Sequence, residues 1–169
     1  LGLGAIGSLV KMRLEAFDMD VVPVRRSRHE NSLGPDEWRD QLGNFDWVVL
    51  AVPSTPETVG MIGAEELAAM KSTAVLVNIA RGDVVDQPAL VSALEEKRIE
   101  AALLDVTDPE PLPEDHPLWG LENAQVTMHL SGRAQTKMFQ RSADRFIANL
   151  DRWHRGEAVE PQLDLALGY

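Results

Sequence analysis

Ala74-Val75-Leu76-Val77-Asn78-Ile79-Ala80-Arg81-Gly82-Asp83-Val84-Val85 contains an apolar, β-branched run that stops at Asn78, with Arg81 three residues later. Nearly every position of the run is apolar, which is typical of a strand buried on both faces of a parallel sheet. Ligands of open α/β sheets bind beyond the carboxyl ends of such strands. Arg81 is therefore predicted to lie at a ligand site, where its planar guanidinium suits a small carboxylate. The alternative is a surface arginine in a turn.

The composition limits the partners that the chain can have. Its 169 residues carry a formal net charge of -11, which argues against nucleic acid and anionic membrane as partners. The absence of cysteine excludes disulfides and thiolate chemistry. The sequence has no apolar stretch long enough to span a bilayer, and its length suits one domain with a real core.

A glycine-rich turn opens the chain. Gly2, Gly4 and Gly7 form the pattern G-x-G-x-x-G, which permits a tight turn, close approach of a pyrophosphate and close packing of a helix on a strand. Apolar residues at helical spacing predict a helix from Ile6 to Phe17 whose amino end faces the phosphates. Such turns also occur in methyltransferases.

The strand that should precede this turn is represented by Leu1 alone. In the common dinucleotide-binding order, that strand lies in the middle of the sheet. We therefore expect the sequence to be a piece of a longer protein, and residues 1–169 to be more stable once an upstream strand is restored.

A basic cluster follows the next predicted strand, Val21–Val24. Enzymes that prefer NAD usually carry an acidic residue at the tip of this strand, where this chain has Arg25-Arg26-Ser27-Arg28. Arginines and a serine hydroxyl would bind the 2′-phosphate of NADP. The cluster favours NADP over NAD, and the alternative is a solvated basic turn.

Strands and helices alternate along the rest of the chain, which predicts a doubly wound, Rossmann-type parallel sheet. Asp86 is a plausible N-cap for a helix that runs to about Lys97, and Trp38 and Leu42 should face inward from a short helix after Pro35. The other predicted elements are strands at 47–52, 101–104 and 125–128, a helix at 64–70, and a long amphipathic segment from 134 to about 155.

Three residues with complementary chemistry each follow a different predicted strand: Arg81, Glu110 and His129. Because strand ends converge in this architecture, the three side chains could meet at one small molecule. The set suits the reduction of a 2-keto acid, in which His129 donates a proton, Glu110 fixes its tautomer and Arg81 holds the carboxylate. Alone, each residue is more often structural or solvated.

The chain resembles the nucleotide-binding domain and C-terminal tail of the D-2-hydroxyacid dehydrogenase family. The stretches that carry the resemblance are Gly2–Gly7, Pro53–Glu57, Met70–Glu96, Ala101–Pro113, His116–Trp119 and Thr127–Gly132. The basic cluster and the ending Asp164–Tyr169 are similar to the glyoxylate/hydroxypyruvate reductase branch.

The resemblance implies site residues, domain organisation and partners. It implies a dinucleotide-binding domain at 1–133 without its first strand, and a helix and tail at 134–169 that return toward a substrate domain. It also implies a homodimer, a cytoplasmic location and a 2-keto or 2-hydroxy acid substrate, with Arg81, Glu110 and His129 as the catalytic residues. The expected cofactor contacts are Gly2, Gly4, Ala5, Ile6, Gly7, Arg25, Arg26, Ser27, Val52, Pro53, Thr58, Ile79, Ala80, Arg81, Asp105, His129 and Gly132.

Two departures from the family pattern lie beside the predicted proton donor. Met128 stands where the family usually has proline, and Arg133 adds a charge nearby. Both bear on the loop conformation and the substrate range.

Three functions compete on this sequence. The first is an NADPH-dependent 2-ketoacid reductase. The second is a non-catalytic dinucleotide-sensing or interaction module of the same fold, and the third is a methyl-donor-binding fold that uses the same glycine turn. The basic cluster and the three site residues have no purpose in the third.

Overall fold

The computed structural model describes residues 1–27, 30–132 and 137–162 of the chain. Arg28, Arg133 and the tail from Leu163 lie outside the described residues. The chain forms two compact units, Leu1–His129 and Leu130–Tyr169.

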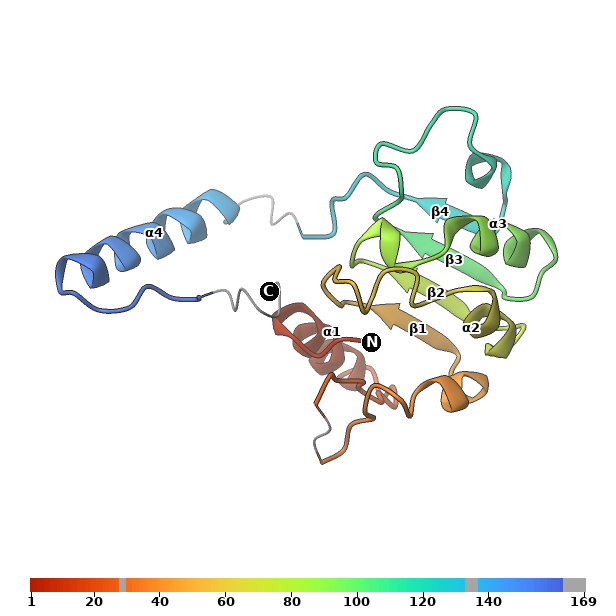
Figure 1. Cartoon of the computed structure of the whole chain (residues 1–169), viewed down its shortest axis with the longest axis horizontal. Helices are drawn as coiled ribbons and strands as arrows, with labels where there is room; N and C mark the ends of the chain where they lie inside the picture. The colour runs from red at the N-terminus through yellow and green to blue at the C-terminus, as the bar shows by residue number, and fades with distance from the viewer. Residues whose placement is uncertain (28–29, 133–136, 163–169) are drawn as a thin grey trace. The chain divides into compact units, whose positions relative to one another are not determined.

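A four-stranded parallel sheet forms the centre of the first unit. Its strands are β1 (Trp47–Leu50), β2 (Val75–Asn78), β3 (Ala101–Leu104) and β4 (Ala124–Val126), in the order β1-β2-β3-β4. Figure 1 shows the four arrows pointing the same way, so that the loops after the strands lie along one edge of the sheet. The predicted α/β class and parallel sheet are confirmed. The expectation that the strand ending at Asn78 is buried on both faces is wrong, because β2 buries Leu76 and Asn78 on one face and leaves Val75 and Val77 half-buried on the other.

Short helices connect the strands. They are α1 (Ala5–Glu15), α2 (Ala64–Ala69) and α3 (Gln87–Glu95), with 3₁₀ turns at η1 (Arg39–Asn44), η2 (Gly82–Val84) and η3 (Pro117–Gly120). The side chain of Asp86 accepts a hydrogen bond from the Ala89 N–H at 3.0 Å, so the predicted N-cap of α3 is confirmed. Trp38 and Leu42 are buried in the core as expected.

One prediction about the amino-terminal part is wrong, because Val21–Val24 forms no strand, only an isolated bridge between Val24 and Leu33. The helix predicted after the glycine turn is confirmed as α1. Its apolar side chains are nevertheless exposed: Ile6 is 56% exposed, and Phe17, just beyond the helix, is 81% exposed. Both segments need a neighbouring strand to pack against. The periodicity of apolar residues in a sequence does not show whether such a strand is present.

A groove lies between α1, residues 19–24 and the free edge of β1, with a volume of about 520 Å³. Leu1 closes its end: its amine donates to the Val49 oxygen at 2.6 Å, and its oxygen accepts from the Ala51 N–H at 2.8 Å. The Gly2 N–H donates to the Val24 oxygen on the opposite side at 3.0 Å. Leu1 and Gly2 together therefore make the hydrogen bonds of a short strand segment between two extended segments.

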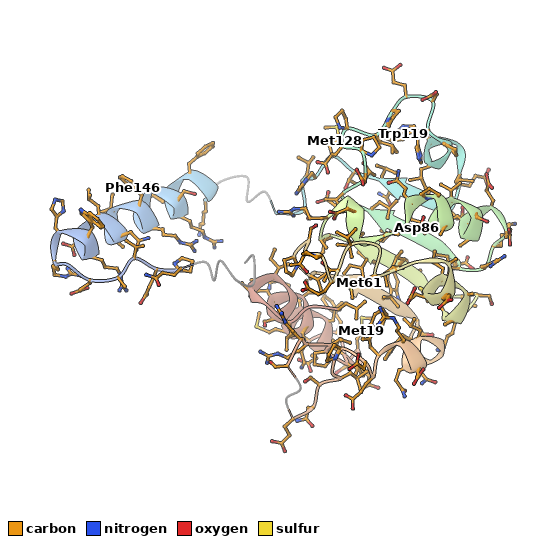
Figure 2. All side chains as sticks on the ribbon, in the orientation of Figure 1. Met19, Met61, Asp86, Trp119, Met128 and Phe146 are labelled. Atoms are coloured by element: carbon orange, nitrogen blue, oxygen red, sulfur yellow. The ribbon has the colours of Figure 1, made fainter. Side chains whose placement is uncertain are left out.

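The second unit contains one long helix, α4 (Met138–His154), within the predicted amphipathic segment. Asn149 exchanges two hydrogen bonds with the backbone of Glu160, and Arg152 pairs with its carboxylate at 2.9 Å, so the chain after the helix folds back along it. Large apolar side chains of α4, among them Phe146, are exposed (Figure 2). Among the described residues no helix is long and apolar enough to cross a membrane.

Candidate functional site

The glycine turn is packed tightly on its inner side and open on its outer side. A Cβ on Gly2, whose φ is +88°, would meet the Ala51 oxygen at 2.6 Å, and a Cβ on Gly7 would meet the Gly2 oxygen at 2.0 Å. Gly4, which precedes α1 without a side-chain cap, has no heavy atom within 4 Å of its Cβ position. The amino end of α1 can therefore be approached closely by a phosphate group, and the residues present fit a dinucleotide pyrophosphate.

The basic cluster lies beside this turn. Val24 bonds to Gly2, and the next residues along the chain are Arg25, half-buried, and the exposed Arg26 and Ser27. The pKa of Glu57 is lowered, chiefly by a hydrogen bond with the Thr55 side chain and more weakly by the charge of Arg26. Arg26 is thus near the loop that follows β1.

Hydroxyl groups tie the loop after β1 to the turn after β2. Thr58 donates from its hydroxyl to the Pro53 oxygen at 2.7 Å, which closes the loop on itself. The Ser54 hydroxyl donates to the carboxylate of Asp83 at 2.6 Å, and the Gly60 N–H donates to the backbone carbonyl oxygen of Asp83 at 2.8 Å. The two segments therefore hold each other in place.

The turn that carries Arg81 is shaped by the last residue of β2. Asn78 is 1% exposed; its side-chain amide donates to the Arg81 oxygen at 2.9 Å, and its side-chain oxygen accepts from the Ala80 N–H at 3.0 Å. The guanidinium of Arg81 is exposed and donates to the Ala80 carbonyl at 2.6 Å. Asn78 thus fixes the backbone while leaving the charge of Arg81 accessible.

Gly82 brings this turn against the segment that leads to Glu110. A Cβ on Gly82 would lie 2.0 Å from the Thr107 oxygen and 2.6 Å from the Asp108 nitrogen. Only glycine permits so close a contact between two backbones. Arg81 and Glu110 are therefore carried by segments in direct contact, although they are far apart in sequence.

Glu110 and His129 form a pair. The Nδ1 atom of His129 lies 2.8 Å from the Glu110 carboxylate, and both side chains are 44% exposed. With Nδ1 bonded to the carboxylate, Nδ1–H is the favoured tautomer and Nε2 is the ring nitrogen free to exchange a proton with a ligand.

The backbone holds His129 in an unusual conformation at the end of β4. Its φ is +52°, in the left-handed region, which costs a non-glycine residue about 1–2 kcal/mol. Hydrogen bonds offset this cost: the His129 N–H donates to the Asp105 oxygen at 2.8 Å, and the Thr127 hydroxyl donates to the Asp105 carboxylate at 2.5 Å. Strain of this kind is typical of functional sites.

The structure brings most of the predicted site residues to the carboxyl edge of the sheet, but it shows no direct contact of Arg81 with the Glu110–His129 pair. Sequence reasoning overlooked Thr127, whose hydroxyl bonds to the Asp105 carboxylate; the available signal was a polar residue at the end of a buried run. Gly132 belongs to the second unit. The remaining predicted cofactor contacts lie in the first turn of α1 or just after strands, at Ala5, Ile6, Val52, Pro53, Ile79, Ala80 and Asp105.

Comparison with known proteins identifies related chains. Residues 1–131 match the family model described as D-isomer specific 2-hydroxyacid dehydrogenase, NAD binding domain. A glyoxylate reductase from Korarchaeum cryptofilum is 42% identical over 96% of this chain and 50% of its own length, so the chain spans about half of that relative.

Solved structures agree with this match. A D-isomer specific 2-hydroxyacid dehydrogenase from Xanthobacter autotrophicus Py2, in complex with NADPH and MES, superposes with a TM-score of 0.91 at 36% identity, covering 99% of this chain and 70% of that one. An NADPH-dependent glyoxylate/hydroxypyruvate reductase from Sinorhizobium meliloti, in complex with NADP and sulfate, gives 0.89 at 25% identity, over 99% and 55% of the two chains.

Proposed function

The chain belongs to the D-isomer specific 2-hydroxyacid dehydrogenase family, and from that premise we propose that the whole protein is an NADP(H)-dependent reductase of small 2-keto acids such as glyoxylate or hydroxypyruvate. The observation that carries the proposal is the Glu110–His129 pair at 2.8 Å, on a segment packed against the turn of Arg81. Relatives named glyoxylate reductase and glyoxylate/hydroxypyruvate reductase support the substrate class.

A nicotinamide cofactor, held at Gly2, Gly4 and the amino end of α1, would supply a hydride to the carbonyl carbon of the substrate. His129 donates the Nε2 proton to the carbonyl oxygen, which completes the 2-hydroxy acid. Glu110 holds the ring by Nδ1, which keeps Nε2 as the ring nitrogen that exchanges the proton. Arg81 binds the substrate carboxylate, for which its guanidinium must turn away from the Ala80 carbonyl.

The cofactor is proposed to be NADP, with NAD as the alternative. Arg25, Arg26 and Ser27 lie next to the glycine turn, and no carboxylate stands among them to repel a 2′-phosphate. Replacing both arginines by alanine should raise KM for NADPH and leave KM for NADH nearly unchanged. A wild-type protein that prefers NADH in kcat/KM would refute this assignment.

The decisive experiment uses His129→Ala in the whole protein. Loss of the proton donor should lower kcat for glyoxylate or hydroxypyruvate by roughly 10²–10⁴-fold, while calorimetry should give an unchanged Kd for NADPH. His154→Ala is the matched control, because that imidazole is exposed and bonds to the Leu150 carbonyl within its own helix α4. Light scattering on the same samples tests the proposed homodimer.

A protein that binds NADPH but turns over neither substrate would instead be the non-catalytic dinucleotide-sensing module. Full activity in His129→Ala would refute the role of His129 as the proton donor.

A further inference from the structure

Gln87 is a buried polar residue that the proposed reaction does not use. It is the first residue of α3 and is buried, whereas its neighbour Asp86 (labelled in Figure 2) is exposed and caps the helix. A buried amide needs hydrogen-bond partners, and those of Gln87 lie 21 and 29 residues away along the chain.

The amide of Gln87 pairs with both backbone groups of Asp108. Its nitrogen donates to the Asp108 oxygen at 2.8 Å, and its oxygen accepts from the Asp108 N–H at 3.1 Å. Because the two bonds need opposite ends of the amide, they fix its orientation. Glu110 follows Asp108 by two residues.

The same amide also contacts the far end of this loop. The Gln87 nitrogen lies 3.1 Å from Nε2 of His116, and the His116 N–H donates to the Pro113 oxygen at 3.1 Å. The buried side chain of Gln87 therefore contacts both ends of the 108–116 loop, Asp108 and His116, and Glu110 lies between these two residues.

The residues around Glu110 are not held by burial, because Asp108, Pro109, Glu110 and Pro111 are all exposed. Other anchors of the loop include the Thr107 hydroxyl, which donates to the Pro109 oxygen at 3.0 Å, the Trp119 indole N–H, which donates to the Pro113 oxygen at 2.8 Å, and the buried side chain of Leu112. The backbone before Glu110 also packs against Gly82.

We infer that Gln87 is a positioning residue, which holds the 108–116 loop so that the Glu110 carboxylate meets Nδ1 of His129. The inference rests on the proposed function only for its catalytic consequence; the contact it explains is present in the structure. A carboxylate moved by about 1 Å no longer makes this hydrogen bond, and misplacement on that scale costs roughly 10²-fold in rate.

The test is a double-mutant cycle in the whole protein with Gln87→Leu and Glu110→Gln. We expect Gln87→Leu to lower kcat by roughly 10- to 100-fold with little change in KM for NADPH, and to cause no further loss in the Glu110→Gln background. Gln87→Met, which keeps the length of the side chain and loses both hydrogen bonds to Asp108, should give a similar loss and covers the case in which the leucine variant fails to fold. Additive losses, or unchanged kcat in both Gln87 variants, would overturn the inference.

Asp86→Ala is the matched control, since it removes the cap of the same helix without touching Asp108 or His116. It should lower Tm and leave kcat unchanged; an equal fall in kcat would show that Gln87 matters only through helix stability.

A second readout does not depend on turnover. Long-range ¹H–¹⁵N spectra of the His129 ring should show the Nδ1–H tautomer in the wild type and in Asp86→Ala. Gln87→Leu, which should displace the acceptor, and Glu110→Ala, which removes it, should both shift the tautomer toward Nε2–H. If the wild type has no reductase activity but this pattern holds, the proposed function fails and the positioning role stands. If the Nδ1–H tautomer persists in Gln87→Leu, the positioning role fails.

Discussion

Gly82→Ala tests the contact that joins the Arg81 turn to the Glu110 loop. The added Cβ would lie 2.0 Å from the Thr107 oxygen and 2.1 Å from its carbonyl carbon, where real contacts are at least 3.0 Å. The two backbones would have to separate by about 1 Å. Gly82 is not among the glycines with positive φ, so the cost is steric overlap alone.

Overpacking of this kind typically costs about 1–3 kcal/mol, and the clash with backbone rather than with a flexible side chain places Gly82→Ala at the upper end. The same separation should lower kcat/KM for the keto acid by roughly 10²-fold, since it moves Glu110 relative to Arg81. Urea unfolding followed by tryptophan fluorescence measures the first effect, and NADPH oxidation by the whole protein measures the second.

Gly120→Ala is the matched control, because its Cβ would have no heavy atom within 4 Å. Its free energy of unfolding should stay within about 0.5 kcal/mol of wild type. Equal unfolding midpoints for the two alanine variants would refute the steric role of close backbone packing at Gly82.

Three further predictions concern stability. For Glu66, burial raises the carboxyl pKa, but hydrogen bonds led by that from the Arg39 side chain outweigh this and lower the pKa below 4.5. The Glu66–Arg39 pair therefore stabilises the fold above about pH 4.5, and this stabilisation is lost as the pH falls through the lowered pKa of Glu66. Arg39→Ala should cost about 0.2–1 kcal/mol more at pH 7 than below the lowered pKa, because the loss of the Arg39–Trp38 ring contact is the same at both pH values; an equal cost in urea titrations at the two pH values would contradict this. Joining an extended apolar strand upstream of Leu1 should raise Tm, because it would fill the groove and pair with the free edge of β1; unchanged calorimetric melting would disprove it. Thr127→Val should cost about 1–3 kcal/mol in chemical unfolding, since it removes a hydrogen bond from the buried Asp105 carboxylate; a neutral result would mean that the remaining partners of Asp105 suffice.

The sheet was predictable because its signals are local. The apolar run that ends at Asn78 has the composition of a strand buried on both faces, and alternation with helical segments implies parallel order. The start of α3 was equally clear, since Asp86 followed by proline is a helix signal within a few residues.

Elements that depend on a distant partner were predicted poorly. Val21–Val24 has strand composition but no neighbouring strand, so it forms only a bridge, and the apolar face of α1 stays exposed for the same reason. A residue pattern records what a segment can bury, whereas the presence of a surface to bury it against is a property of the whole fold.

The same distinction between local pattern and tertiary packing holds for the candidate site. The order of strands placed Arg81, Glu110 and His129 at one edge of the sheet from the sequence alone, because parallel strands must end together; their catalytic roles stay predictions. The sequence predicted that Glu110 orients His129, and the tertiary structure supplies the contact between them. Tertiary structure alone decided that Gly82 presses two backbones together and that Gln87 contacts both ends of the loop that carries Glu110. The hydrogen bonds among these contacts join residues 19 to 29 positions apart at distances of 2.8 to 3.1 Å. Geometry on that scale depends on how complete loops pack, and local propensity carries no information about it.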